Sequence, residues 1–266
     1  MPTSNPLAGL LDWYVAMGAD EAIGADARNR LAPAPARPPP PSPQPAEAPP
    51  AYRPSPPAAL APPSDAAESA RKLAAAARTL PELEAAIRAF EGCALKQTAT
   101  NTVIADGNPA SGLMLIGEAP GADEDRVGKP FVGRAGQLLD RMLAAIGIDR
   151  SRAYITNVLY WRPPGNRTPS TDEIAICLPF LWRHIALVNP RVVVLAGGTA
   201  ASTLLGRKEG IMRLRGRWFE LPVAGLEKPV AALASYHPSF LLRAPARKSE
   251  AWIDLLSLKA KLEAGA

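Results

Sequence analysis

Cysteine, histidine and long apolar runs are scarce in this chain of 266 residues. Two cysteines are too few for the disulfide framework of a small secreted protein. The first residues contain neither a basic segment nor the apolar stretch of a signal peptide or a membrane span. The two histidines and two cysteines do not stand at zinc-ligand spacing, and the Gly-x-Ser-x-Gly elbow of serine hydrolases is absent. We therefore expect a cytoplasmic protein without membrane contact.

Proline is concentrated in one window. Half of the 30 prolines lie within residues 31–63. Because proline fixes φ and lacks a backbone N–H, this window cannot join a helix or a sheet. We predict a semi-extended linker over residues 31–64, which would span about 100 Å at about 3.1 Å per residue. A proline-rich ligand for an SH3-type domain is the alternative interpretation.

The segment before the linker, residues 1–30, has the pattern of an amphipathic helix. Its apolar side chains recur at helical spacing, at Leu7, Leu10, Leu11 and Tyr14. Such a helix could dock on a partner protein through this face, or it could pack on its own body or fray. The composition thus divides the chain into a helical head, a linker and a body over residues 65–266.

Basic residues outnumber acidic ones in the body. Residues 1–64 contain four arginines and five acidic side chains, which leaves 26 basic and 20 acidic residues and a net charge of +6 for the body. This excess suits a polyanionic partner such as nucleic acid, although it also serves solubility.

Strand-like and helix-like segments alternate along the body. Continuous apolar runs predict buried strands at 113–116, 154–159, 191–196 and 230–236, and residues 213–221 suggest a hairpin. Helical patterns cover 66–89, 135–146, 171–188, 198–205 and 248–262. Unbroken apolar strands that alternate with helices predict an α/β fold with a parallel sheet covered on both faces. Because ligands bind beyond the carboxyl ends of such strands, the residues that follow them are the candidate site.

Acidic residues follow the first predicted strand, in the sequence GEAPGADED. They are Glu118, Asp123, Glu124 and Asp125. These carboxylates could bind a metal or position a water molecule, and they would equally serve as helix caps in a solvated loop.

A polar side chain also follows each of two later strands. Asn157 offers one acceptor and two donors, which suit either the edge of a base or the backbone of a loop. His237 could stabilise developing negative charge, or it could be structural. The second histidine, His184, lies within a predicted helix and is expected to be a helix residue.

Five motifs of the body, taken together, resemble the family 4, iron–sulfur type uracil-DNA glycosylases. They are GEAPGADED at 117–125, PFVG at 130–133, YITN at 154–157, RPPGNR at 162–167 and HPSFLLR at 237–243. The likeness spans residues 88–245 and leaves out the N-terminal 64 residues. It implies a three-layer αβα sandwich around a four-stranded parallel sheet. It also implies hydrolysis of the N-glycosidic bond of deoxyuridine in DNA, which leaves an abasic site.

The resemblance implies roles for residues of these motifs. Phe131 would stack on a uracil that is flipped out of the DNA, and Ala119 would also contact the base. Asn157 would bind O4 and N3–H of uracil and thereby reject cytosine. His237, as a neutral donor, would stabilise the departing uracil anion.

The sugar and the DNA backbone would meet other residues of the motifs. The carboxylates that could stabilise the sugar or orient water are Glu118 and Glu124, with Asp125 behind them. A wedge into the base stack would come from Leu241 and Leu242. The expected phosphate contacts are Lys129, Arg134, Arg167 and Arg243.

The sequence departs from the family at its iron–sulfur site. Family members hold a [4Fe–4S] cluster on four cysteines, and the matching positions here are Phe90, Cys93, Trp161 and Cys177. Aromatic side chains cannot bind iron, and a cubane needs four donors. We therefore predict no cluster and no other cofactor, with the two rings filling the volume. The cysteines are left as buried free thiols, as a disulfide, or as ligands of a cluster shared across a dimer.

Two functions follow from these observations. The first is a uracil-DNA glycosylase of base excision repair that acts as a monomer on uracil-containing DNA at the nucleoid. The second is a non-catalytic uracil- or DNA-binding module that the linker tethers to a repair or replication partner.

Overall fold

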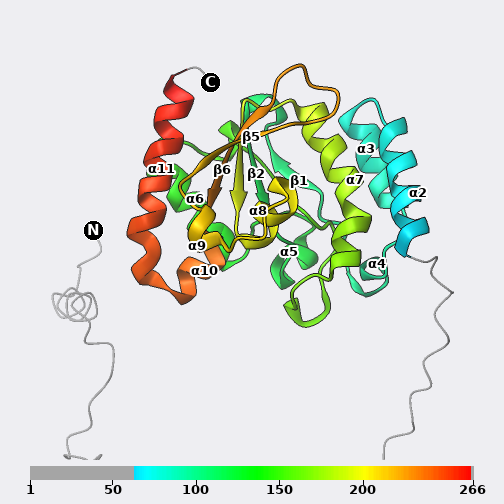
Figure 1. Cartoon of the computed structure of the whole chain (residues 1–266). Helices are drawn as coiled ribbons and strands as arrows, with labels where there is room; N and C mark the ends of the chain where they lie inside the picture. The colour runs from blue at the N-terminus through cyan, green and yellow to red at the C-terminus, as the bar shows by residue number, and fades with distance from the viewer. Residues whose placement is uncertain (1–62, 265–266) are drawn as a thin grey trace, which may run out of the picture. The chain divides into compact units, whose positions relative to one another are not determined.

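The computed structural model describes residues 63–264, which form an α/β domain (Figure 1). The predicted head helix over residues 1–30 and the linker up to residue 62 lie outside the described residues. The domain begins with α2 (Pro63–Ala76), so the last two residues of the predicted linker belong to a helix. Proline is tolerated at this first helical position because its missing N–H is not needed there.

A mixed sheet of six strands forms the centre of the domain, in the order β1-β3-β2-β4-β6-β5. The four inner strands run parallel to one another: β3 (Tyr154–Asn157), β2 (Leu113–Gly117), β4 (Val192–Ala196) and β6 (Val230–Ser235). The two edge strands run antiparallel to their neighbours: β1 (Ala105–Gly107) and β5 (Trp218–Leu221). The predicted α/β class is confirmed, but the prediction of a four-stranded, wholly parallel sheet is wrong at both edges.

The edge strands lack the sequence signal that reveals the inner ones. β1 has only three residues, none fully buried, and one of them is a glycine. The hairpin expected over 213–221 is instead α9 (Ile211–Leu214) followed by β5, which pairs with β6. Edge strands are covered on fewer sides than central ones, so their sequences need no continuous apolar run.

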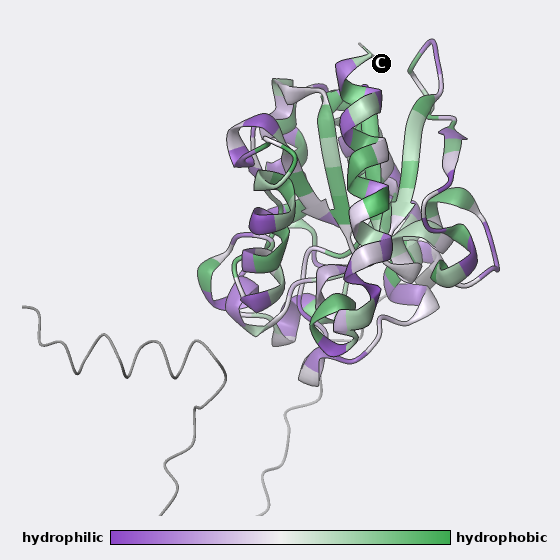
Figure 2. Cartoon of the chain, turned by 90° about the vertical axis from the view of Figure 1, so that its left-hand side faces the viewer, coloured by the Kyte–Doolittle hydropathy of each residue, from purple (hydrophilic) through white to green (hydrophobic). Residues whose placement is uncertain are grey.

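Helices cover both faces of the sheet, and Figure 2 shows the apolar strands between them. One face, which carries Met114 and Ile116 of β2, packs against α7 (Thr171–Val188) and α8 (Gly198–Leu205). The other face, which carries Leu113 and Leu115, packs against helices on the opposite side: α6 (Arg134–Ala144) and α11 (Lys248–Glu263). Because successive strand residues point to opposite faces, burial on both sides explains the unbroken apolar runs.

Two helices at the start of the domain pack on the outside of α7 (Figure 1). The single helix predicted over 66–89 is divided into α2 and α3 (Leu80–Ala89). Thr79 causes the division, because its extended backbone starts α3 and its hydroxyl accepts the N–H of Glu82.

Short helical segments complete the domain. The α-helical ones are α4 (Leu95–Thr98), α5 (Ala122–Val127) and α10 (Pro238–Arg243). The 3₁₀ turns are Pro109–Ser111, Arg150–Arg152, Pro164–Asn166 and Pro245–Arg247. Within residues 63–264, no helix combines the length and the apolar composition needed to cross a membrane.

Candidate active site

A cavity of about 540 Å³ opens beyond the carboxyl ends of the parallel strands. Its walls are the segments that follow β2, β3, β4 and β6, and the register places Gly117 of β2 beside Asn157 of β3. The cavity therefore lies where an open parallel sheet binds its ligands. Many of the residues predicted from the sequence line it: Glu118, Ala119, Glu124, Phe131, Asn157, Arg167, His237 and Arg243.

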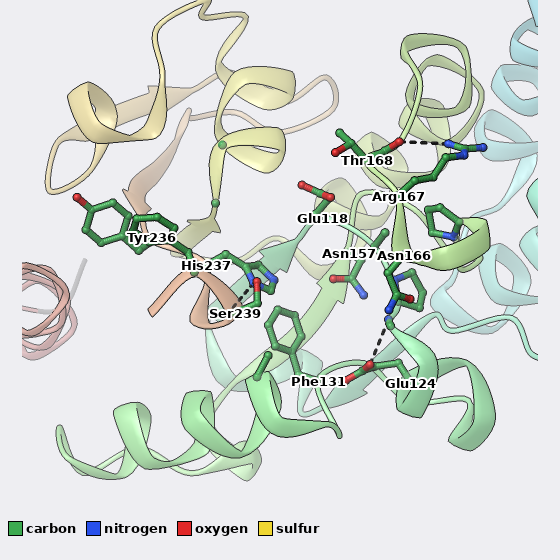
Figure 3. Close-up of a pocket in the computed structure, with 18 of the residues that line it drawn as sticks. Glu118, Glu124, Phe131, Asn157, Asn166, Arg167, Thr168, Tyr236, His237 and Ser239 are labelled. Carbon is green, nitrogen blue, oxygen red and sulfur yellow. Dashed lines mark hydrogen bonds between the residues drawn. The ribbon is translucent and has the colours of Figure 1, made fainter. Parts of the chain in front are cut away.

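Three side chains converge on the centre of this cavity (Figure 3). They are Phe131, Asn157 and His237. The ring centroids of Phe131 and His237 lie 5.3 Å apart, with the planes tilted by 30°. A Cβ atom on Gly117 would come within 2.4 Å of Asn157 Oδ1 and 2.6 Å of the Phe131 ring. Glycine at position 117 thus lets an aromatic ring and an amide meet over the end of β2.

The Asn157 side chain has an unused acceptor. The residue is only 2% exposed, and its Oδ1 atom accepts no hydrogen bond from any group in the described part of the chain. A buried polar atom without a partner costs free energy, so such atoms are rare in folded proteins. Asn157 Oδ1 is therefore available to accept a hydrogen bond from a donor on a ligand in the cavity.

The His237 ring is held in one tautomer. Its Nδ1 atom accepts the backbone N–H of Ser239 at 3.1 Å and lies 2.7 Å from the Ser239 hydroxyl. A nitrogen that accepts carries no proton, so the neutral ring carries its proton on Nε2. Burial, with a smaller contribution from Arg243, lowers the pKa of His237 to about 4. Near neutral pH the cavity therefore contains an uncharged N–H donor.

The three candidate carboxylates have different surroundings. Glu124 accepts the backbone N–H groups of Gly121 at 3.1 Å, and of Val132 and Gly133 at 2.9 Å each. Within residues 63–264, the Glu118 carboxylate accepts only the Thr199 hydroxyl. Glu124 is thus committed to the loop around it, whereas Glu118 keeps acceptor capacity for a ligand or a water molecule.

Asp125 lies apart from the other two acids. It is buried and accepts the N–H groups of Thr100 at 2.8 Å and Asn101 at 3.0 Å. It is not among the residues that line the cavity. The structure therefore places Asp125 as an anchor for the loop before β1.

The predicted DNA contacts also differ in their surroundings. Leu241, predicted as part of the wedge, is 1% exposed and packs in a small core cluster with Leu138 and Tyr236, so it is not presented at the surface of this structure. Leu242 is half-buried and Arg243 is exposed at the end of α10.

The basic residues of the other loops have partners of their own. Arg167 forms a two-pronged ion pair with Glu173, at 2.9 and 2.6 Å, and Lys129 contacts Asp106 at 3.1 Å. Arg134 is exposed at the first position of α6.

Several cavity residues escaped prediction from the sequence. They are Asn166, Thr168, Ile211, Tyr236, Ser239 and Phe240. Asn166 and Ser239 stand inside motifs already quoted, so their place in turns next to the site could have identified them. Ile211 lies on α9, far from every motif, and nothing in the sequence marks it as a wall of the cavity.

The four positions that match the iron–sulfur ligands come together in the core. The rings of Phe90 and Trp161 stack with centroids 6.5 Å apart. Cys93 and Cys177 are fully buried free thiols, and the neighbouring Cys177 side chain lowers the pKa of Cys93. In the described part of the chain, no three His, Cys, Asp or Glu residues are grouped to hold a metal. Two sulfurs beside two aromatic rings do not fit a cubane, which needs four donors.

His184 is a helix residue, as expected. It is buried in α7, and its Nε2 atom lies 2.9 Å from the hydroxyl of Tyr154 on β3. Burial lowers the pKa of His184 to about 4.

Fold and cavity together define an α/β domain whose site suits a planar, hydrogen-bonding ring. The family profile of the "Uracil DNA glycosylase superfamily" matches residues 104–256. The chain belongs to this superfamily.

Similar proteins include three that are named Type-4 uracil-DNA glycosylase. The Pyrobaculum aerophilum protein is 39% identical over 180 residues, which are 66% of this chain and 91% of that protein. The Thermotoga maritima protein is 41% identical over 158 residues, 59% of this chain and 80% of that protein. The Archaeoglobus fulgidus protein is 39% identical over 176 residues, 65% of this chain and 87% of that protein.

Proposed function

We propose that the protein is a uracil-DNA glycosylase that hydrolyses the N-glycosidic bond of deoxyuridine in DNA and leaves an abasic site. The family and the names of the similar proteins support this activity. The observation that carries it is the buried, unpartnered Oδ1 of Asn157, which faces a cavity beside an aromatic ring.

Asn157 supplies the recognition of uracil. Uracil presents the N3–H donor next to the O4 acceptor, so Oδ1 would accept N3–H while the amide nitrogen donates to O4. Cytosine presents an acceptor and a donor in the opposite order, which would leave both groups of a buried amide unpaired. A site built on such hydrogen bonds rejects the wrong ligand strongly, because buried polar groups without partners are costly. Phe131 supports the face of the base, and Ala119 completes its surroundings.

His237 supplies the stabilisation of the leaving group. Cleavage breaks the bond between C1′ and N1, and the electron pair remains on the uracil ring and its O2 atom. The Nε2–H of a neutral His237 would donate to O2 and stabilise this anion. The pKa of about 4 keeps the imidazole uncharged at neutral pH, so the donor is available without a change of protonation.

Glu118 is the carboxylate that we assign to the sugar. The leaving base makes C1′ electron-poor, and a water molecule adds there and loses a proton. A carboxylate with free acceptor capacity can stabilise this positive charge or orient the water molecule. Glu118 has that capacity, whereas the three backbone N–H groups already occupy Glu124.

Binding to DNA would use residues at the surface around the cavity. A uracil inside a duplex must be flipped out, at a cost of a few kcal/mol. Leu242 is the remaining candidate for the wedge, and Lys129, Arg134 and Arg243 are the candidates for phosphate contacts. Arg167 would act with Glu173 in shaping the loop beside the cavity. One chain provides all of these residues, so the proposed activity requires no second copy.

Catalysis without an iron–sulfur cluster is part of the proposal. Phe90 and Trp161 are 4% and 1% exposed and stack in the core, where a cluster would need sulfur ligands. The rings bury apolar surface at this place, and the two cysteines act as small core residues.

A single-turnover assay tests the activity. Excess protein is mixed with an oligonucleotide that contains one uracil, and abasic sites are detected by strand scission after alkali. We expect cleavage of this substrate and none of a matched thymine oligonucleotide. Binding of the uracil oligonucleotide without cleavage would contradict the proposal and support the non-catalytic module.

A further inference from the structure

Phe131 has an unusual backbone. Its φ is 54°, in the left-handed region that favours glycine. A bulky residue keeps such a conformation only where its surroundings enforce it, and such positions concentrate at functional sites. This backbone carries the ring that lies 5.3 Å from His237 in the cavity.

Arg150 holds the carbonyl side of Phe131. It lies in the 3₁₀ turn before β3, and its guanidinium donates hydrogen bonds to the carbonyl oxygens of Phe131 and Pro130. The Phe131 carbonyl is packed against α6 on its other side, where a Cβ atom on Gly136 would lie 1.7 Å from the oxygen. The carbonyl is therefore confined between a guanidinium and a glycine.

Two carboxylates fix the guanidinium itself. Its Nε donates to Asp140 of α6 at 2.8 Å, and one Nη donates to Asp106 of β1 at 2.8 Å. Burial alone would raise the pKa of Asp106, yet the hydrogen bonds from Arg150 and Lys129 hold it below its usual value. The planar fork of arginine can satisfy all of these acceptors at once, which a lysine ammonium cannot do in the same geometry.

Glu124 holds the chain on the other side of Phe131. Its carboxylate accepts the N–H groups of Val132 and Gly133, the two residues that follow the ring. Arg150 thus holds the carbonyl groups of Pro130 and Phe131, and Glu124 holds the N–H groups of the two residues that follow.

We propose that Arg150 is a positioning residue of the active site. It keeps Phe131 in its left-handed conformation, so that the ring already stands where the base must stack. Arg150 does not line the cavity and acts only through Phe131. This inference rests on the proposed function, because it takes the ligand of the ring to be uracil. The alternative role for Arg150, a structural link between β1 and α6 with no effect through Phe131, predicts a different result in the experiment below.

The central test is a double-mutant cycle between Arg150→Gln and Phe131→Ala. We expect R150Q to slow single-turnover uracil release by on the order of 10- to 100-fold, because a small misplacement of a stacking group is costly. In the F131A background, R150Q should cause no further loss, since the ring through which it acts is gone. Losses that multiply would overturn the proposal, as would a wild-type rate in R150Q.

Binding measurements separate positioning from general damage. We expect R150Q to weaken binding of an oligonucleotide with non-cleavable 2′-fluoro-deoxyuridine, and to leave binding of one with a tetrahydrofuran abasic analogue unchanged. Equal weakening of both would overturn the proposal. The matched control is Arg152→Gln, because Arg152 is exposed in the same turn and, within residues 63–264, its side chain donates only to the Gly147 carbonyl, at 3.0 Å. It should behave as wild type in every assay.

If R150Q does not fold, Asp140→Asn replaces it in the double-mutant cycle with F131A. Asp140 is half-exposed and holds the same guanidinium, so we expect D140N to slow uracil release less than R150Q would. A D140N loss that persists in the F131A background would overturn the proposal. A wild-type protein that releases no uracil would overturn the proposed function, and this inference with it. Uracil release by the wild type combined with an additive cycle would overturn the inference alone.

Discussion

His237 presents an N–H donor whose tautomer is set by the turn at Ser239, and Asn157 presents a buried amide at the end of β3. Removal of the Asn157 amide should remove both recognition and orientation of the base. We expect Asn157→Ala to slow uracil release by at least about 100-fold, as loss of one preorganised polar group commonly does. The ratio of the release rates of uracil and cytosine should also fall, and single-turnover assays on matched oligonucleotides measure both rates. Asn108→Ala is the control, because Asn108 is exposed and caps a 3₁₀ turn. Wild-type rates in N157A would refute the role assigned to Asn157.

Glu118 and Glu124 should respond differently to substitution. Glu118→Gln removes the charge of a carboxylate with one hydroxyl partner, so we expect a large loss in kcat and an almost unchanged Tm. Glu124→Ala leaves three backbone N–H groups without an acceptor and should lower the free energy of unfolding by about 1–3 kcal/mol. Rates and thermal melts of both variants check the assignment. A lower Tm for E118Q than for E124A would contradict the assignment of Glu118 to the reaction and Glu124 to the loop.

Helix α6 depends on a glycine at one place. Alanine generally stabilises a helix over glycine by up to about 1 kcal/mol. Gly136→Ala should nevertheless lower both Tm and the rate of uracil release, because the new Cβ would collide with the Phe131 carbonyl. Gly210→Ala is the comparison, since its φ is −68° and the space around it is open. G136A with the stability and rate of wild type would contradict the packing of α6 against the Phe131 turn.

At the scale of elements, the inner strands could be predicted from the sequence, whereas the two edge strands could not. β2 and β4 are buried along their whole length, so an apolar run was required of them. β1 needs no such run because it lies at an edge of the sheet. Among site residues, Asn157 and His237 could be predicted because each follows a buried strand. Arg150 could not, because it acts on backbone carbonyls, and a contact with backbone leaves no pattern in the sequence.

The whole domain should lose stability in mild acid. Burial lowers the pKa of both His184 and His237 to about 4, below the usual 6.5. The unfolded chain therefore binds protons at a higher pH than the native protein does, so stability is full above pH 6.5 and is lost as the pH falls towards 4. His184 alone should contribute a loss of about 3 kcal/mol. Urea midpoints of wild type and His184→Gln across this range test the prediction, and an equally steep loss in both would contradict it.

Iron should be dispensable for the molecule as a whole. We expect freshly purified protein to lack the visible absorption of a cluster and to keep its activity after treatment with a strong chelator, because Phe90 and Trp161 offer no ligands. Elemental analysis gives the direct measurement. Iron at cluster stoichiometry would overturn the proposal that catalysis proceeds without this group.

The hydrogen bond that fixes the tautomer of His237 limits which substitutions at position 239 would disturb the site. Its donor includes a main-chain amide at position 239, which every residue except proline possesses. The backbone of the turn is therefore sufficient to keep Nδ1 unprotonated, and the Ser239 hydroxyl contributes a second contact to the same nitrogen. We therefore expect Ser239→Ala to keep the Nε2–H of His237 directed at the base, and Ser239→Pro to remove the main-chain donor.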